Sequence, residues 1–398
     1  MPPMQSETRN VLILACAQAL FQTATVMLLI LSGLAGLMLA PHKSLATLPL
    51  AMMTATAAAA MIPASMFMQR YGRRAGFLLG ASLGSTAGIV AAAGIALNNF
   101  WLFAFANMMV GGYQSFAQFY RFAAADTASD SFRSRAISWV VSGGVVAAVA
   151  GPNIARVTAH IGAVPYLWSY LALSGTGVIA MLLIGQLDLP PSAVVAHGYA
   201  RPLSRIVRQP VFLTAWLGSS VGFAVMVMVM TATPLAMRIC GQPFGASASV
   251  IQWHVLGMFV PSFFTGKLIR RFGVLSVMTC GIALLFASVC VAIAGVAFPN
   301  FVCGLILLGI GWNFLFIGGT TLLTESYRPA ERAKTQATHD LAMFGAVTLA
   351  SFSAGSLLDA WGWRGVNLTA LPFLALAACM VALLGLSRRA EGAVVASR

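Results

Sequence analysis

Long apolar runs constrain this chain more than any other feature of its sequence. Runs of about 20 residues follow one another with short polar connections between them. A helix of about 20 residues rises about 30 Å, which matches the hydrocarbon thickness of a bilayer. We therefore predict twelve membrane-spanning helices, near residues 11–39, 47–68, 76–96, 101–124, 136–158, 165–187, 211–238, 247–268, 275–297, 300–325, 336–359 and 366–387.

The composition agrees with a membrane protein. The chain has 398 residues, of which 59% are hydrophobic and 8% are charged. A soluble fold could not bury so much apolar surface, so the soluble classes are excluded. The net charge of +14 comes from short basic clusters between the apolar runs, whereas a nucleic-acid-binding protein carries one continuous basic face. We expect a lipid bilayer as the partner and no nucleic acid.

Lysine and arginine residues outside the predicted spans are biased to one side of the membrane. Those on the opposite side are Lys43, Arg156, Arg238 and Arg364. The larger set consists of Arg9, Arg70, Arg73, Arg74, Arg133, Arg135, Arg201, Arg205, Arg208, Lys267, Arg270, Arg271, Arg328, Arg332, Lys334, Arg388, Arg389 and Arg398. Because positive loops remain in the cytoplasm, we predict that this side and both chain termini are cytoplasmic. The first apolar run is too long for a signal peptide and is expected to stay as the first span.

Two short basic connections have closely similar sequences. The first is Arg70-Tyr71-Gly72-Arg73-Arg74, and the second, about 200 residues later, is Arg270-Arg271-Phe272-Gly273. Each joins two apolar runs through a few residues, which predicts a tight turn between two helices at the cytoplasmic face. The chain is therefore expected to contain two similar halves, repeated in the same direction.

These connections resemble a loop of the major facilitator superfamily, usually written G-x-x-x-D-[RK]-x-G-[RK]-[RK]. That loop lies between the second and third helices, with a weaker copy between helices eight and nine. The first connection departs from it at Ser65 and Gln69, where the family has glycine and aspartate. The resemblance implies an all-α polytopic membrane protein with twelve transmembrane helices in two six-helix bundles. It also implies a bacterial permease of the inner membrane that works by alternating access.

A stretch rich in proline and arginine lies at the midpoint of the chain and predicts the linker between the halves. The expected domains are residues 1–187, a cytoplasmic linker at 188–210, and residues 211–398. The resemblance implies that acids at the ends of spans four and ten bind the arginines of the basic turns as rigid latches. Asp126 is expected to bind Arg73 or Arg74, and Glu325 to bind Arg270 or Arg271. The predicted latch residues are Arg70, Gly72, Arg73, Arg74, Asp126, Arg270, Arg271, Gly273 and Glu325.

Candidate solute-binding residues come from the spans that line the central cavity in the family the chain resembles. On span four, two tyrosines, a phenylalanine and an arginine share one helical face. Aromatic and amide side chains of this kind suit a small organic molecule with a flat or mixed polar surface. Arg121 favours an anionic solute, and its alternative role is to extend to the cytoplasmic surface. The candidates are Gln18, Gln22, Tyr113, Gln114, Phe116, Tyr120, Arg121, Gln252, His254, Trp312, Asn313 and Phe316.

The energy source is expected to be a proton gradient, with no bound cofactor. The chain has Pro261 where a phosphate-binding G-x-x-x-x-G-K loop would need its first glycine, so ATP is excluded. Arg121, His254, His339 and Asp340 are the candidate coupling and gating groups. We hypothesise that Arg121 and Asp340 approach one another when the cytoplasmic side closes. One alternative is that His254 is a structural residue hydrogen-bonded to a neighbouring carbonyl. The other is that Asp340 stabilises the start of its helix.

Other functions are less well supported by the sequence. The run Gly80-Ala81-Ser82-Leu83-Gly84 formally matches a serine-hydrolase motif, but no turn or histidine partner accompanies it. Glycine at every fourth position there predicts close helix packing. Span five matches the pattern of proton-exchanging exporters only in part, since two of its glycines are alanine. The function expected is secondary transport by a monomer and not catalysis. Both uptake and efflux stay open. A receptor without transport is the less favoured alternative.

Overall fold

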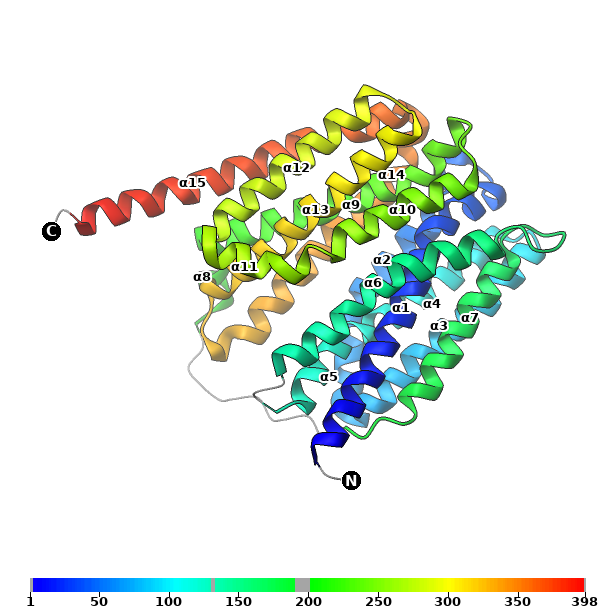
Figure 1. The fold of residues 1–398 in the computed structure, drawn as a ribbon, viewed down its shortest axis with the longest axis horizontal. Coiled ribbons are helices and arrows are strands. Elements are labelled where there is room, and N and C mark those ends of the chain that lie inside the picture. Colours follow the sequence, from blue (N-terminus) through cyan, green and yellow to red (C-terminus); the bar gives the residue numbers. More distant parts are fainter. Residues whose placement is uncertain (1–2, 130–132, 190–200, 397–398) are drawn as a thin grey trace. The chain divides into compact units, whose positions relative to one another are not determined.

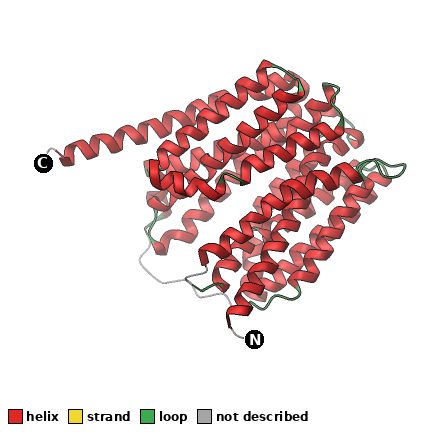
Figure 2. Cartoon of the chain, in the orientation of Figure 1, coloured by secondary structure: helices red, strands yellow, loops and turns green. Residues whose placement is uncertain are grey.

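The structure is a computed structural model that describes residues 3–129, 133–189 and 201–396. These residues form helices and no strands (Figure 2). The α-helices, in the order that can be followed in Figure 1, are α1 (Pro3–Leu39), α2 (Leu48–Tyr71), α3 (Arg73–Ala96), α4 (Phe100–Ala117), α5 (Tyr120–Thr127), α6 (Arg133–Thr158), α7 (Leu167–Ile184), α8 (Leu203–Val207), α9 (Pro210–Ile239), α10 (Phe244–Phe259), α11 (Ser262–Phe272), α12 (Val274–Ala294), α13 (Phe298–Leu323), α14 (Arg332–Leu368) and α15 (Ala370–Ala396). The prediction of an all-α membrane protein is confirmed.

Within the described residues, nine helical ranges are long and apolar enough to cross a membrane. The difference from the predicted twelve has three sources. The range Lys334–Ala390 contains two predicted spans. A break divides residues 101–124 into α4 and α5, of which α4 is long enough but not apolar enough to be counted. A second break divides residues 247–268 into α10 and α11, which are both too short. Pro261 lacks an N–H group and explains the second break, whereas no glycine or proline explains the turn at Gln118 and Phe119. The count of twelve therefore stays a prediction.

The two basic turns have the same backbone conformation. Gly72 has φ 85° and ψ 155°, and Gly273 has φ 84° and ψ 154°. A side chain would meet open space at either position, so glycine is required for its positive φ and not for close packing. In both turns an arginine lies over the aromatic ring that precedes the glycine. The distance from guanidinium to ring centre is 5.3 Å for Arg70 over Tyr71 and 5.3 Å for Arg271 over Phe272. The repeated turn predicted from the sequence is present in the structure.

The chain divides into two compact units. The first unit consists of Met1–Val194 with Thr231–Val255, and the second unit consists of Val195–Met230 with Leu256–Arg398. The predicted domain boundaries at 187, 188–210 and 211 stay a prediction. Residues 190–200 of the predicted linker lie outside the described residues.

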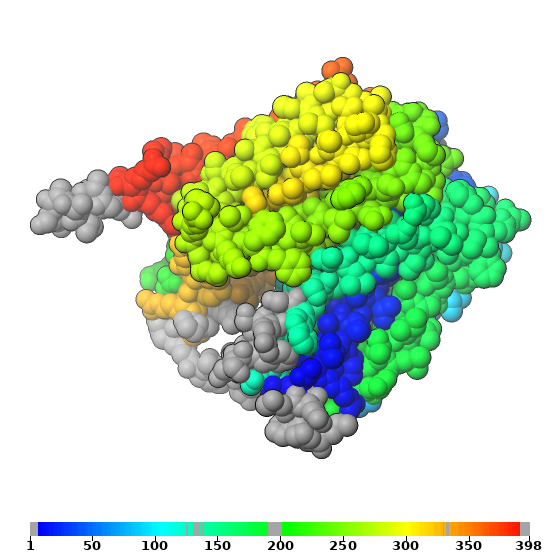
Figure 3. Space-filling model, in the orientation of Figure 1, coloured from blue at the N-terminus to red at the C-terminus, as the bar shows by residue number. Residues whose placement is uncertain are grey.

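In the first unit, glycines of α3 allow close helix packing. α1 packs against α6 and α7 (Figure 3). α3 packs against α4 and α7. A Cβ atom at Gly80 would lie 2.8 Å from Cβ of Phe116, and one at Gly84 would lie 2.4 Å from Cδ1 of Tyr113. Both distances are too short for any larger residue. The packing interpretation of this glycine stripe is confirmed, and Ser82 donates a hydrogen bond to the carbonyl of Leu79 within the same helix.

In the second unit, glycines likewise allow close packing where α12 crosses α13. A Cβ atom at Gly281 would lie 3.0 Å from the carbonyl oxygen of Gly311, and one at Gly311 would lie 2.9 Å from that of Gly281. The absence of side chains at both positions lets the two backbones touch. α12 also packs against α14 and α15.

Candidate functional site

Basic side chains tie helix ends together in the first unit. The predicted contact between Asp126 and Arg73 is present, with 2.6 Å between the carboxylate and the guanidinium. Arg9 donates a hydrogen bond of 2.7 Å to the carbonyl oxygen of Gln186, and Arg74 donates to that of Gly185. The last carbonyls of a helix lack partners within the helix, so these arginines satisfy the end of α7. The latch role of these contacts stays a prediction.

The corresponding prediction for the second unit is wrong. Glu325 forms its ion pair with Arg388 of α15, at 2.6 Å, and not with Arg270 or Arg271. Both turn arginines are exposed, and the guanidinium of Arg271 lies over the ring of Phe272. The fold of the second unit brings an arginine from a later helix to the acid, which no short sequence pattern could indicate.

A buried ion pair that the sequence analysis missed joins the region before α9 to the start of α14. The Glu331 side chain is 0% exposed. Its carboxylate accepts hydrogen bonds from Nε of Arg201 at 2.8 Å, from Nη2 of Arg201 at 2.7 Å and from the backbone N–H of Arg328 at 2.9 Å. The hydrogen bond from Arg201 is the main reason that the pKa of Glu331 lies well below its ordinary value. The sequence did carry a signal for this ion pair, because Glu331 is the one acidic residue in the basic connection between predicted spans ten and eleven.

His339 connects a serine and an aspartate in the second unit. Its Nε2 atom lies 2.8 Å from Oγ of Ser219 on α9, and its Nδ1 atom lies 2.9 Å from Oδ1 of Asp340. Ser219 also donates a hydrogen bond of 2.8 Å to the carbonyl of Ala215. Because α14 begins at Arg332, Asp340 lies about two turns inside the helix and does not stabilise its first turn. Ser219, the third member of this chain, was not among the predicted site residues.

The two residues of the predicted gate, Arg121 and Asp340, belong to different units. Arg121 belongs to the first unit, where its guanidinium lies 4.8 Å from the centre of the Phe122 ring. Asp340 belongs to the second unit. Their approach stays a prediction, as does the coupling role of His254, which is fully buried on α10.

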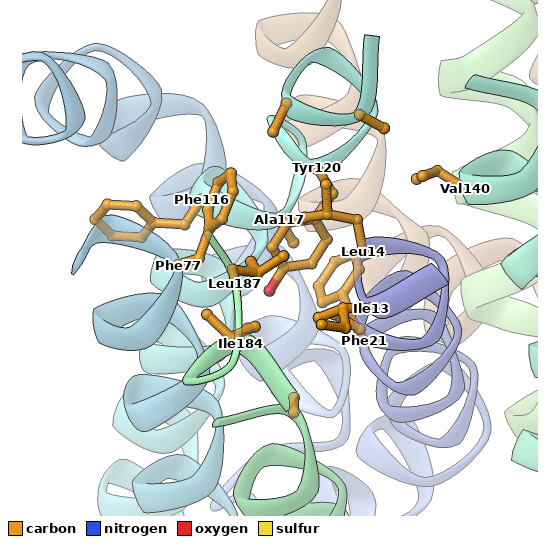
Figure 4. Packing of buried hydrophobic residues seen from close by; sticks show 14 of the residues in the cluster. Ile13, Leu14, Phe21, Phe77, Phe116, Ala117, Tyr120, Val140, Ile184 and Leu187 are labelled. Atoms are coloured by element: carbon orange, nitrogen blue, oxygen red, sulfur yellow. The ribbon is translucent and has the colours of Figure 1, made fainter. Parts of the chain in front are cut away.

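Three predicted solute-binding residues pack the core of the first unit. Tyr113, Phe116 and Tyr120 are buried in one hydrophobic cluster, although the turn at Gln118 separates the helices that carry them. Phe116 and Tyr120 are labelled in Figure 4. Gln18 and Gln22 are half-buried on α1. The side-chain oxygen of Gln114 is buried and accepts no hydrogen bond among the described residues. A hollow of about 420 Å³ between α2 and α4 includes none of these side chains and is lined by Ala55, Thr56, Ala59, Ala60 and Met108.

Asn313 closes the break between α10 and α11. Its amide nitrogen donates to the carbonyl of Met258 at 2.7 Å and to Oγ of Ser262 at 2.6 Å. Its amide oxygen accepts a hydrogen bond of 2.7 Å from Thr265. The break leaves backbone groups without helical partners, and Asn313 satisfies one of them, the carbonyl of Met258. The contacts of this predicted solute-binding residue support a structural role.

An aromatic cluster surrounds Trp312 in the second unit. Trp312 and Phe316 stack with 5.0 Å between ring centres and an angle of 10°. Phe223 of α9 meets both edge-on, at 5.5 Å and 5.7 Å. Phe344 of α14 lies 5.9 Å from Phe223, and Phe259 of α10 lies 6.4 Å from Trp312. Trp312 and Phe316 were predicted, whereas the other three come from helices whose rotation the sequence does not reveal.

Comparisons with known proteins agree over most of the chain. A sequence profile of the Major Facilitator Superfamily matches residues 11–241 and 235–398. The riboflavin transporter RfnT of Brucella anthropi is 42% identical over 374 residues, covering 92% of this chain and 94% of that protein. The uncharacterized MFS-type transporter YdeG of Bacillus subtilis is 30% identical over 314 residues, covering 74% of this chain and 73% of that protein.

Solved structures show the same fold. An inward-facing, occupied bacterial homologue of the human lysosomal transporter Spinster has a TM-score of 0.72 at 16% identity, covering 96% of this chain and 97% of that one. A bacterial metal transporter has a TM-score of 0.68 at 14% identity, covering 96% of this chain and 98% of that one. At these identities the likeness concerns the fold alone.

Proposed function

Since the chain belongs to the Major Facilitator Superfamily, and is therefore a multi-pass membrane transporter of a small molecule and not an enzyme, we propose that its solute is riboflavin or a closely related flavin. The observation that carries this proposal is the 42% identity to a riboflavin transporter over 92% of the chain. The transporter would act as a monomer in the bacterial inner membrane, with both termini in the cytoplasm.

The predicted site residues suit this solute. Riboflavin combines a flat aromatic ring system with a chain of hydroxyl groups, and the candidates combine aromatic rings with the amides Gln18, Gln22 and Gln114. Riboflavin itself is neutral, whereas Arg121 led to the expectation of an anion. Riboflavin phosphate is the anionic competitor that tests this expectation: preference for it, lost on Arg121→Gln, would assign the anion-binding role to Arg121.

Proton coupling is supported by the hydrogen-bond chain through His339. When the imidazole is neutral, Nδ1–H donates to Asp340, and Nε2 accepts the hydroxyl hydrogen of Ser219. When it gains a proton, Nε2–H donates to Oγ of Ser219, and the hydroxyl hydrogen turns to the carbonyl of Ala215. One proton can thus be taken up or released while every hydrogen bond of the imidazole is kept. Alternating access would then expose the hydrogen-bonded group of Ser219, His339 and Asp340 to each side of the membrane in turn.

Transport assays in proteoliposomes test both parts of the proposal. We expect a pH gradient to drive accumulation of labelled riboflavin, and a protonophore to abolish it. Asp340→Asn should lose gradient-driven accumulation and keep exchange of labelled for unlabelled riboflavin, which requires no gradient. Right-side-out and inverted vesicles separate uptake from efflux. Failure of wild-type protein to exchange any flavin would refute the solute, and accumulation without a pH gradient would refute the coupling.

A further inference from the structure

The aromatic cluster around Trp312 is more than core filling. Trp312 is only 6% exposed, and its indole N–H is buried without a hydrogen-bond partner among the described residues. Phenylalanine or leucine would fill such a position without burying an unsatisfied donor, which is unfavourable for folding. By contrast, the buried Trp363 of the same unit donates its indole N–H to the carbonyl of Ala292 at 3.1 Å. An acceptor supplied by a bound solute would satisfy the indole N–H of Trp312.

The cluster also has an accessible aromatic side. Phe223, Phe259 and Phe316 are half-buried, whereas Trp312 and Phe344 are buried. The parallel pair Trp312 and Phe316 offers flat aromatic surface for a further planar ring, because offset stacking is favourable between aromatic systems. No member of the cluster is charged. A suitable ligand is therefore a neutral planar ring system with hydrogen-bond acceptors at its rim.

The cluster adjoins the hydrogen-bond chain of His339. Ser219 precedes Phe223 by one helical turn on α9, and Asp340 precedes Phe344 by one turn on α14. Residues one turn apart in a helix are neighbours on its surface. A solute at the aromatic cluster would thus lie next to the group that exchanges the proton.

Resting on the flavin transport proposed above, we propose that these five aromatic residues bind the isoalloxazine ring of the flavin, and that the indole N–H of Trp312 donates a hydrogen bond to a ring carbonyl or imine nitrogen. Indole is a donor only, and the isoalloxazine rim carries two carbonyl oxygens and two unprotonated nitrogens. The ring would be recognised by the second unit, and the hydroxyl chain would extend away from the cluster.

Fluorescence titration of the purified full-length protein with riboflavin tests this site, because stacking on indole quenches flavin fluorescence. Trp312→Phe keeps an aromatic ring and removes the donor, and should raise the Kd about tenfold, equal to about 1.4 kcal/mol. Phe223→Leu keeps the bulk and removes a ring, and should raise the Kd severalfold. Lumiflavin, which has the ring without the hydroxyl chain, should compete with riboflavin, and ribitol should not.

Trp363→Phe is the matched control, since it removes an indole that is already satisfied within the protein. Its Kd should stay within about twofold of wild type. If Trp312→Phe and Phe223→Leu both bind riboflavin as tightly as wild type, the ring site is refuted while flavin transport stands. If wild-type protein neither quenches riboflavin fluorescence nor exchanges labelled riboflavin, the proposed function itself is refuted.

Discussion

Replacing Asn313 by alanine decides whether this residue holds the second unit together or binds the solute. Its amide makes three hydrogen bonds, of 2.7 Å to Met258, 2.6 Å to Ser262 and 2.7 Å to Thr265. Asn313 is only 1% exposed, so water does not replace these partners. At about 1 kcal/mol for each hydrogen bond, we expect Asn313→Ala to lower the free energy of unfolding by about 3 kcal/mol.

Thermal unfolding of the purified protein, followed by circular dichroism, measures this loss. For a unit of 150 to 250 residues, about 3 kcal/mol corresponds to a fall in Tm of about 6–12 °C. Asn367→Ala is the matched control, because the buried Asn367 donates one hydrogen bond, of 2.9 Å, to the carbonyl of Trp363 in its own helix. That variant should lose about a third as much.

Riboflavin binding by the same variants completes the test. Below its lowered Tm, Asn313→Ala should bind riboflavin with the wild-type Kd. A variant with unchanged Tm and a Kd raised about tenfold would refute the structural reasoning and assign Asn313 to solute binding.

Other perturbations follow from the packing and charges of each unit. Gly84→Ala should lower Tm by several degrees, because its Cβ would lie 2.4 Å from Tyr113, a strain of about 1–3 kcal/mol. Gly175→Ala, which meets open space in α7, should leave Tm unchanged or raise it. Because the pKa of Glu331 is lowered in the folded protein, its contribution is present above the unfolded value of about 4.5 and is lost as the pH falls through the folded value. Glu331→Gln should therefore lower Tm at pH 7, and the Tm of this variant should fall less than that of wild type as the pH is lowered. Ser219→Ala should make gradient-driven riboflavin accumulation less efficient, since Nε2 of His339 loses its partner, and an unchanged pH profile of accumulation would argue against the proton chain.

The chain's local patterns were sufficient for several conclusions. Runs of about 20 apolar residues require a bilayer, because no soluble core could bury them. Gly72 and Gly273 predicted tight turns, since few other residues adopt a positive φ. The glycines of α3 indicated close packing, and the motif resemblance led to the contact between Arg73 and Asp126. Each of these conclusions depends on residues close together in sequence or on one recurring motif.

Tertiary structure alone decided which distant side chains meet. Glu325 binds Arg388, Ser219 binds His339, and Phe223 and Phe344 join Trp312, because helices in each unit are rotated and tilted by the packing of all their neighbours. A break at Pro261 also separates α10 from α11, and Asn313 of α13 donates a hydrogen bond to the Met258 carbonyl at this break. The length of an apolar run determines that a helix lies in a membrane, but the side chain it presents to each neighbour depends on contacts that only the folded chain supplies.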